Sequence, residues 1–388
     1  MTTDTMLETL DAGRDPERAA MRRVLMHESA TAFFAGTSAL FNARLAQCAG
    51  DIPSSPLAWC SGNLHLESVG AYRADNTLAY FDLTRLDESG LAPVAWDLVR
   101  LATSIRMAAR SAGQPERSDD TLVHAALADY GTAVTSGTVR WVERSQARGP
   151  IRKLLKAVGK RSHRKLIKAH TVSRRGKVAL RHDGRDGLEP DVADRELIEG
   201  WFAAYREADP SRRDWELVDT ARRASDVAHL GYPHWMLLVR TSRLRLLDVR
   251  ACVPSSLAAS SATLQPGWSD EASRVEALIR RLPVLPPPRL AATRVGEIDA
   301  IVSDFRPAAD DLSLEPVPGP KALKRVVRTV AMLVGWAHLR AAGRQGADRP
   351  DALAWWGREA AAFEQISRLS RALADEQLNA WHEFRENG

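Results

Sequence analysis

Apolar residues along the first 145 positions recur mainly at helical spacing. One stripe with a 3.6-residue period runs from Leu40 to Cys48, and further helices are predicted from about 93 to 105 and over 117–145. Between them, residues 78–83 have the pattern of a short strand. This part of the chain is therefore predicted to be helical around a few short extended segments.

The strongest β signal lies in the second half of the chain. Apolar runs at 235–239 and 244–249, joined by a tight connection, predict a β-hairpin. A helix is predicted over 271–282, where a run of prolines ends it, and a strand over 298–302. From 321 to 387 the pattern is helical again.

The composition is that of a folded protein with a substantial core. Of the 388 residues 45% are hydrophobic, which excludes disordered and fibrous proteins and favours two lobes over one small module. The three cysteines show neither an even count nor a CxxC spacing, so neither a disulfide framework nor a cysteine zinc site is predicted. We expect a protein of the reducing cytoplasm.

No membrane partner is expected. The first residues carry acids where a signal peptide has a basic start. The apolar run at 330–334 is far shorter than the ~20 residues of a spanning helix.

The net charge of +5 is concentrated in one segment. Residues 140–185 hold 16 Lys or Arg against only Glu143 and Asp183. An apolar stripe from Ile151 to Val158 lies opposite the basic positions, which predicts an amphipathic basic helix. The segment could bind nucleic acid or an acidic partner through its cations, or it could be a solvated helix face with a mobile loop. Both interpretations remain open at this point.

Three segments, in order, carry a resemblance to a known family. Residues 62–68 read GNLHLES, residues 81–88 read FDLTRLDE and residues 96–100 read WDLVR. The sequence resembles the bacterial family called domain of unknown function 2252, whose patterns are GDxHxEN for the first loop and FDxNDFDE for the second. That family is regarded as a divergent relative of protein kinases and aminoglycoside phosphotransferases.

Weaker matches extend the resemblance over most of the chain. In chain order they are an FxRG element at 33–36, a glycine-rich GVGSVGTRxW element at 226–235, a strand LQVKE at 247–251 and a helix AHxRxG at 337–343.

The resemblance implies a mainly helical α+β protein with the two-lobed fold of protein kinases. Because the catalytic-type loop at 62 precedes the glycine-rich element near 226, the fold would be circularly permuted. The helix around His338 would then supply the helix that stands before the catalytic loop in an ordinary kinase. The implied regions are a helical lobe with catalytic-type loops at 1–140, a basic helical insertion at 141–214, a small β-containing lobe at 215–315, and C-terminal helices at 316–388 that return to the helical lobe.

Several positions that carry the chemistry of an active kinase are altered. Such a site needs a carboxylate base, an Asn and an Asp that hold magnesium, a lysine on the phosphates, and glycines that admit phosphate to backbone N–H groups. The first loop keeps His65, but Asn63 stands in place of the base, and a neutral amide cannot accept a proton near pH 7. Ser68 replaces the metal-binding Asn. In the second loop Asp87 matches the family, whereas Arg85 places a permanent cation where a magnesium ligand is expected.

The phosphate-binding elements are altered as well. The glycine-rich element keeps Gly231 but has Asp226 at its first position, where an acid would repel a polyphosphate. Arg250 stands at the lysine position and is cationic but differently shaped. Arg85 could bind an anionic ligand in place of the metal, or pair with Asp82 or Asp87 and close the site. Four further matches to the family would hold the loops together as buried partners: His65, Asp87, Asp97 and Arg100.

We therefore expect a pseudokinase-like protein that binds a protein partner, a small anion or a nucleotide such as ATP in the former ATP cleft, without magnesium. One alternative is an active ATP-dependent phosphotransferase of small molecules, in which Asp82 and Asp87 hold the metal and Arg85 and Arg250 hold phosphates. Another is a nucleic-acid-binding accessory protein that uses residues 140–185.

Overall fold

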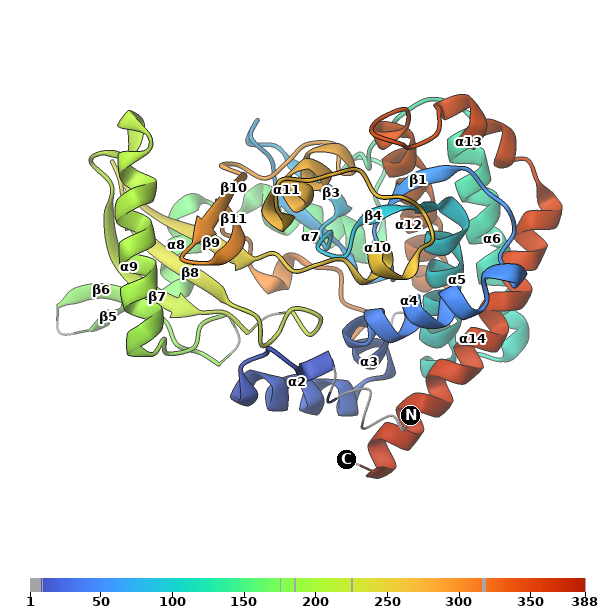
Figure 1. Ribbon diagram of the computed structural model, residues 1–388, viewed down its shortest axis with the longest axis horizontal. Helices are drawn as coiled ribbons and strands as arrows, with labels where there is room; N and C mark the ends of the chain where they lie inside the picture. Colours follow the sequence, from blue (N-terminus) through green and yellow to red (C-terminus); the bar gives the residue numbers. More distant parts are fainter. Residues whose placement is uncertain are drawn as a thin grey trace.

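The computed structural model describes residues 8–387 except 9, 175, 185, 225 and 316–318. The fold is α+β, about half helical with small sheets, which confirms the predicted class. The start of the predicted C-terminal region, 316–318, lies outside the described residues. In Figure 1 a five-stranded sheet and helix α9 lie at one end of the molecule, and helices α5, α6, α12, α13 and α14 lie at the other.

The helices of the described residues are α2 (Pro16–Glu28), α3 (Ala30–Gly36), α4 (Ser38–Gln47), α5 (Val94–Ser111), α6 (Glu116–Thr135), α7 (Gly149–Lys160), α8 (His163–His170), α9 (Val192–Glu207), α10 (Ser256–Ser260), α11 (Glu271–Arg281), α12 (Pro320–Ala341), α13 (Pro350–Trp356) and α14 (Ala360–Asn387). The strands are β1 (Leu57–Cys60), β2 (Val69–Arg73), β3 (Ala79–Leu83), β4 (Gly90–Pro93), β5 (Thr171–Arg174), β6 (Lys177–Leu180), β7 (Glu216–Arg222), β8 (His234–Arg240), β9 (Leu244–Ala251), β10 (Ala291–Val295) and β11 (Ile298–Asp304).

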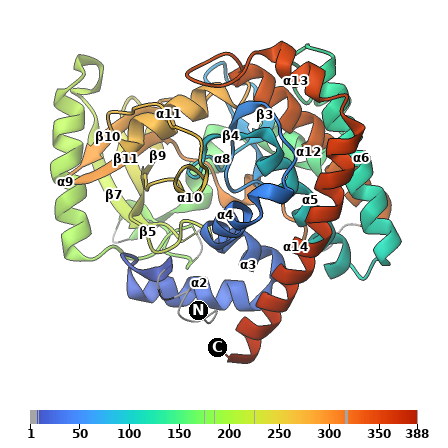
Figure 2. The ribbon, with the colours of Figure 1, turned by 45° about the vertical axis from the view of Figure 1, so that its right-hand side comes forward.

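The largest hydrophobic core forms around α5, which is buried along most of its length. Helix α6 packs against α5, α12 and α14, and α14 also packs against α5. The turned view shows α14 running along the outer side of this group (Figure 2). The close approach of α12 to α6 needs a residue without a side chain, because a Cβ on Gly335 would lie 2.8 Å from the Ala133 Cβ. This helical cluster carries the hairpin β2–β3 and the antiparallel pair β1–β4, which flanks the hairpin in the sequence, and thus the loops at 61–68 and 84–89.

The large sheet is antiparallel throughout, in the order β10-β11-β9-β8-β7. Side chains alternate between the faces of a strand, and β9 uses this alternation to separate its charges from its apolar residues. Leu247 and Val249 join the core beneath α9, whereas Asp248 and Arg250 face a cavity on the other side. The sheet thus presents charged groups toward the helical cluster.

The structure confirms the strongest periodic predictions and corrects weaker ones. The β8–β9 hairpin, helix α11 and the amphipathic basic helix α7 form as predicted. The helix predicted over 117–145 ends at Thr135, because Gly137 adopts φ +60°, a conformation that glycine provides at helix ends. Part of the basic segment, predicted as helix or loop, forms the hairpin β5–β6. Among the described residues, no helix is long and apolar enough to cross a membrane.

Candidate functional site

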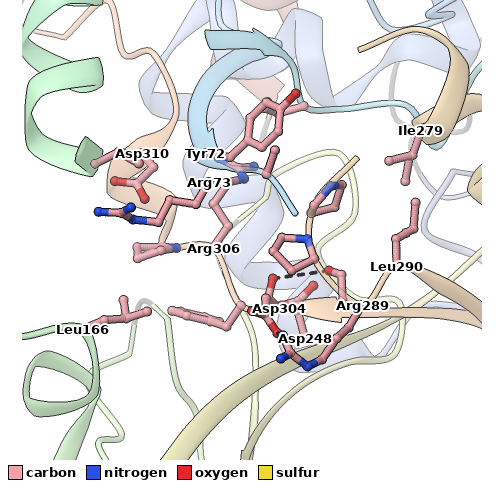
Figure 3. A pocket seen from close by; sticks show the side chains of 18 of the residues that line it. Tyr72, Arg73, Leu166, Asp248, Ile279, Arg289, Leu290, Asp304, Arg306 and Asp310 are labelled. Carbon is pink, nitrogen blue, oxygen red and sulfur yellow. Dashed lines mark hydrogen bonds and ion pairs between the residues drawn. The ribbon is translucent and has the colours of Figure 1, made fainter. Parts of the chain in front are cut away.

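A cavity of about 680 Å³ lies against the charged face of the large sheet. Its walls come from β8, β9 and β11, from the α7–α8 junction, and from the segments 283–290 and 303–311. Figure 3 shows charged side chains such as Asp248, Asp304 and Arg306 on one side and the apolar Ile279 and Leu290 on another. The volume lies in the range of sites for small organic ligands.

Most charged groups of the cavity wall are paired with one another. Arg161 donates two hydrogen bonds of 2.6 Å to Asp310, which fixes the α7–α8 junction to the segment after β11. Further pairs join Arg306 to Asp311 at 2.5 Å, Arg289 to Asp304 at 2.7 Å and Arg223 to Asp248 at 2.5 Å. Asp248 also accepts a hydrogen bond from His234 at 3.0 Å. This pairing satisfies buried charges that would otherwise be costly.

Arg85 makes its ion pairs with two acids outside its own loop. Its Nη1 lies 2.7 Å from the Asp226 Oδ1, and its Nη2 lies 3.7 Å from the Asp311 Oδ2. The pairing with Asp82 or Asp87 considered from the sequence is therefore wrong. Asp82 instead binds Arg340 at 3.0 Å, and Asp87 lies 3.0 Å from the Arg250 Nη2, so both candidate partners are already engaged.

The Arg85–Asp226 pair is a strongly coupled contact of opposite charges. About 15% of each side chain remains exposed. Burial alone would raise the pKa of the Asp226 carboxyl, but the charges of Arg85 and Arg250 outweigh it and hold that pKa well below its usual range. Burial would lower the pKa of Arg85, whereas Asp226 and Asp311 raise it. Both groups therefore stay ionised at neutral pH.

The loop at 226–232, which corresponds to the glycine-rich element, uses its own backbone groups internally. The N–H of Ala228 donates to the Asp226 carboxylate, and the N–H groups of His229 and Leu230 donate to the Asp226 carbonyl. The Tyr232 N–H donates to the His229 carbonyl. Because these four N–H groups are already hydrogen-bonded, they are not available to bind a phosphate.

The N-terminal segment clamps the same loop from outside. Arg14 donates to the carbonyls of Leu230 at 2.6 Å and Ala228 at 3.1 Å, and its guanidinium stacks 3.9 Å from the centre of the Tyr232 ring. Gly231 has φ +102°, and a Cβ there would lie 2.7 Å from the Arg14 Cβ. Gly231 is thus required by this packing and does not line the cavity.

The loop at 61–68 is buried and held by side chains. The Asn63 amide donates to the Ala35 carbonyl at 3.0 Å, and its oxygen accepts from Arg100. The Ser68 Oγ donates to the His65 carbonyl at 2.7 Å. The Nδ1 of His65 accepts from the Glu67 N–H, while its Nε2 is buried without a partner. Burial lowers the pKa of His65 well below its ordinary value, aided by Arg85 and Arg100.

Asp97 fixes the start of this loop. Its carboxylate accepts hydrogen bonds from the N–H groups of Ser61 at 2.8 Å and Gly62 at 3.2 Å, and it lies 3.3 Å from the Nε2 of His338 on α12. Cys60, Asp97 and His338 are the group in the described residues whose possible metal-ligand atoms lie within 4.8 Å of one another. The Asp97 oxygens are already occupied by backbone donors, so we assign the group to holding the loop.

Asp82 and Asp87 do not form a joint metal site in this arrangement. Asp82 is buried; one oxygen accepts from the Val284 N–H and the other from the Leu83 N–H, while Arg340 binds both. Burial raises the pKa of its carboxyl, although Arg340 opposes this. Among the sequence-predicted site residues only Arg250 lines the cavity, and its Nε is buried without a hydrogen-bond partner.

Sequence reasoning missed the residues that occupy the site. Arg14 and Asp311 lie outside every motif, and Arg340 lies in the AHxRxG element but was assigned no partner; the residues that these three contact are far away in the chain. One signal was present: Arg85 and Asp226 are both departures from the family pattern, and they carry opposite charges. Two such departures in one sequence indicate that the residues contact each other.

The comparisons with known proteins find a family but no characterised relative. A family model described as "Uncharacterized protein conserved in bacteria (DUF2252)" matches residues 14–387. No curated protein and no solved structure matches the chain.

The Arg85–Asp226 pair can be tested with a double-mutant cycle. Removal of one partner leaves an uncompensated charge, so Arg85→Met and Asp226→Leu should each lower the free energy of unfolding by about 3–5 kcal/mol. The double variant should lose clearly less than the sum, as measured by urea unfolding. Arg294→Met, which breaks an exposed pair with Glu297, is the control and should cost at most about 1 kcal/mol. Additive losses would contradict the coupling.

Buried histidines predict a loss of stability in mild acid. Burial lowers the pKa of His65 and of His229 well below the ordinary value of 6.5, so the unfolded chain takes up protons there that the folded chain does not. As pH falls below 6.5, each histidine should cost up to about 1.4 kcal/mol per pH unit. His229→Gln should flatten this dependence between pH 6 and 5 in unfolding titrations, relative to the surface control His382→Gln. Equal slopes for both variants would refute it.

Proposed function

The chain belongs to the DUF2252 family of uncharacterized bacterial proteins, and we propose that it is a kinase-like protein with a degenerate site that binds a small anionic ligand without magnesium-dependent phosphoryl transfer. The ligand would occupy the cavity between the large sheet and the helical cluster. The Arg85–Asp226 ion pair carries this proposal. Arg85 stands at the position of a magnesium ligand and Asp226 in the loop that would bind phosphate, so one contact engages both places.

The arrangement of the large sheet supports the kinase-like part of the proposal. In chain order it comprises β7, the loop at 226–232, β8, then β9 with Arg250, helix α11, and the pair β10–β11. A kinase likewise has a glycine-rich loop, a phosphate-binding lysine on its third strand and a following helix. The loops at 61–68 and 84–89 belong to the helical cluster, as they would in the second lobe of a permuted kinase.

Three observations support the loss of ordinary catalysis. Arg85 holds a cation at the position of a magnesium ligand and is neutralised by Asp226 and Asp311. Asn63 is a buried amide that binds Arg100 and the Ala35 carbonyl, so it is a part of the scaffold and not a base. Four N–H groups of the loop at 226–232, those of Ala228, His229, Leu230 and Tyr232, are engaged within the loop. Each alteration removes a separate requirement for phosphoryl transfer.

Two observations support an anionic ligand. The cavity is large enough for a small organic molecule. The Nε of Arg250 in its wall has no hydrogen-bond partner in the described residues, and a buried cationic donor of this kind favours an anion or an ordered water.

A second candidate function, nucleic-acid binding through residues 140–185, is favoured by the exposed cations of α7, α8 and β6. The following side chains are exposed and form no ion pair with a described residue: Arg152, Lys153, Lys156, Lys160, Arg164, Lys165, Lys168 and Lys177. Such a surface would attract a polyanion at low salt.

Nucleotide and magnesium titrations test the main proposal. ATP, ADP and GTP should give no magnesium-dependent rise in the unfolding temperature, and ATP should not be hydrolysed. The opposing result is a magnesium-dependent stabilisation, about 2.7 kcal/mol at 100 times the dissociation constant, with turnover that Asp87→Asn or Asp82→Asn abolishes. That result would establish the active phosphotransferase instead.

The nucleic-acid candidate predicts a salt-dependent affinity. Binding of a fluorescent 20-nucleotide single strand should weaken linearly on logarithmic axes as salt rises. The variant Lys153→Glu/Lys156→Glu/Lys160→Glu should flatten the slope by about 2, or ~0.7 for each lost phosphate contact. The control Lys321→Glu/Lys324→Glu/Arg325→Glu makes the same charge change on α12 and should leave the slope unchanged. Equal effects of the two variants would exclude a site on the basic segment.

A further inference from the structure

The mouth of the cavity holds two arginines whose side chains form no ion pair with a described acid. Eight arginines and six aspartates line the cavity. Most are joined in the pairs described above, and Arg73 donates to backbone carbonyls. The side chains of Arg243 and Arg245, on either side of Leu244 at the β8–β9 connection, form no hydrogen bond or ion pair with a described residue. The surplus positive charge of the cavity is therefore concentrated at this mouth.

Arg289 adds a third cation to the same place. It adopts φ +57°, a strained conformation for a residue with a side chain, and strain of this kind is concentrated at binding sites. Asp304 neutralises it, at 2.7 Å in the pair drawn in Figure 3. Burial lowers the pKa of Arg245, and the neighbouring charge of Arg289 lowers it further. Asp304 thus pairs directly with Arg289, and its charge also acts on Arg245. This single carboxylate does not balance the three arginines, so an added anion would relieve their repulsion.

An apolar wall begins directly beside this cluster. Leu290 follows Arg289 in the chain, and Figure 3 shows Leu290 and Ile279 together on the side of the cavity next to it. Leu285 and Pro288 belong to the same wall, and Tyr72, whose hydroxyl donates to the Leu285 carbonyl, borders it. A ligand in contact with both parts needs an acidic end and an apolar body.

The charge balance opposes a nucleoside triphosphate. Its phosphates carry several negative charges, but the inner arginines of the cavity are already paired with aspartates. Displacing those pairs would leave carboxylates unpaired in a poorly solvated space. The free arginines at the mouth match one acidic group with one or two negative charges.

We propose that the cavity binds an amphipathic organic anion, with its single acidic head group at Arg243, Arg245 and Arg289 and its apolar body along Ile279, Leu285 and Leu290. This inference rests on the proposed function and specifies its ligand. The exposed cations of α8 stand next to the mouth, since His163 at the start of α8 contacts the Leu244 carbonyl. They attract the anion toward the cavity without lining it.

Calorimetric titration of the intact chain with small probes tests the proposal. Octyl phosphate and octanoate, below their micelle concentrations, should each bind once per chain, and the tighter of the two identifies the head group. Inorganic phosphate and the neutral octyl glucoside should bind at least about tenfold more weakly, because the first lacks the apolar body and the second lacks the acidic head group. ATP should also bind more weakly than octyl phosphate. An octyl glucoside or inorganic phosphate affinity equal to that of octyl phosphate would overturn the proposal.

Two variants separate direct contact from general attraction. Arg243→Ala/Arg245→Ala should weaken octyl phosphate binding at least about tenfold, the cost of losing charge-assisted hydrogen bonds. Arg164→Ala/Lys165→Ala removes the same charge from the exposed face of α8 and should weaken it less than about twofold at physiological salt. Equal losses would overturn the head-group site. If no amphipathic anion binds while magnesium-dependent turnover is also absent, the ligand class is wrong but the degenerate site stands.

Discussion

The requirement that a buried charge must find a partner determines the form of this site. Arg85 stands on a loop of the helical cluster and Asp226 on a loop of the sheet, so their contact joins the two parts of the molecule across the cavity. Removal of either group would leave the charge of the other without a partner in a poorly solvated place. The same rule governs Arg161 with Asp310, where a junction of basic helices is fastened to the segment that follows the sheet.

Under the proposed function, this pattern explains how loops of catalytic type would persist without catalytic chemistry. Asp97 fixes the backbone of the loop at 61–68, and Asn63 and Ser68 donate hydrogen bonds to backbone carbonyls that hold the loop in place. These interactions stabilise loop geometry whatever the loop does. Under the same proposal, Arg85 and Asp226 stand where a kinase would touch metal and phosphate, and they are joined to each other. Binding of an anion at the mouth is then the chemistry that best matches the cavity wall.

The sequence predicted the elements whose pattern is local. The β8–β9 hairpin and helix α11 follow from periodicity, because burial of one face determines where apolar residues stand. The β5–β6 hairpin was missed because each strand has only four residues and Leu180 alone is buried, which is too short a pattern to show an alternation. Partners of buried charges were missed for another reason: Arg85 and Asp226 are 141 positions apart, and Arg340 and Asp82 are 258 apart. Only the folded topology selects among the many acids available to each arginine.

The N-terminal clamp has a consequence for how the chain is made. Arg14 binds carbonyls 214 and 216 positions later, and the Met26 carbonyl accepts a hydrogen bond from Trp381 near the end of α14. During synthesis at roughly 5–20 residues per second, helix α2 must wait for nearly the whole chain before it can dock. Helix α2, although it is synthesised early, thus completes its packing only after Trp381 on α14 has emerged, and Arg14 waits more than 200 residues for the loop that it binds.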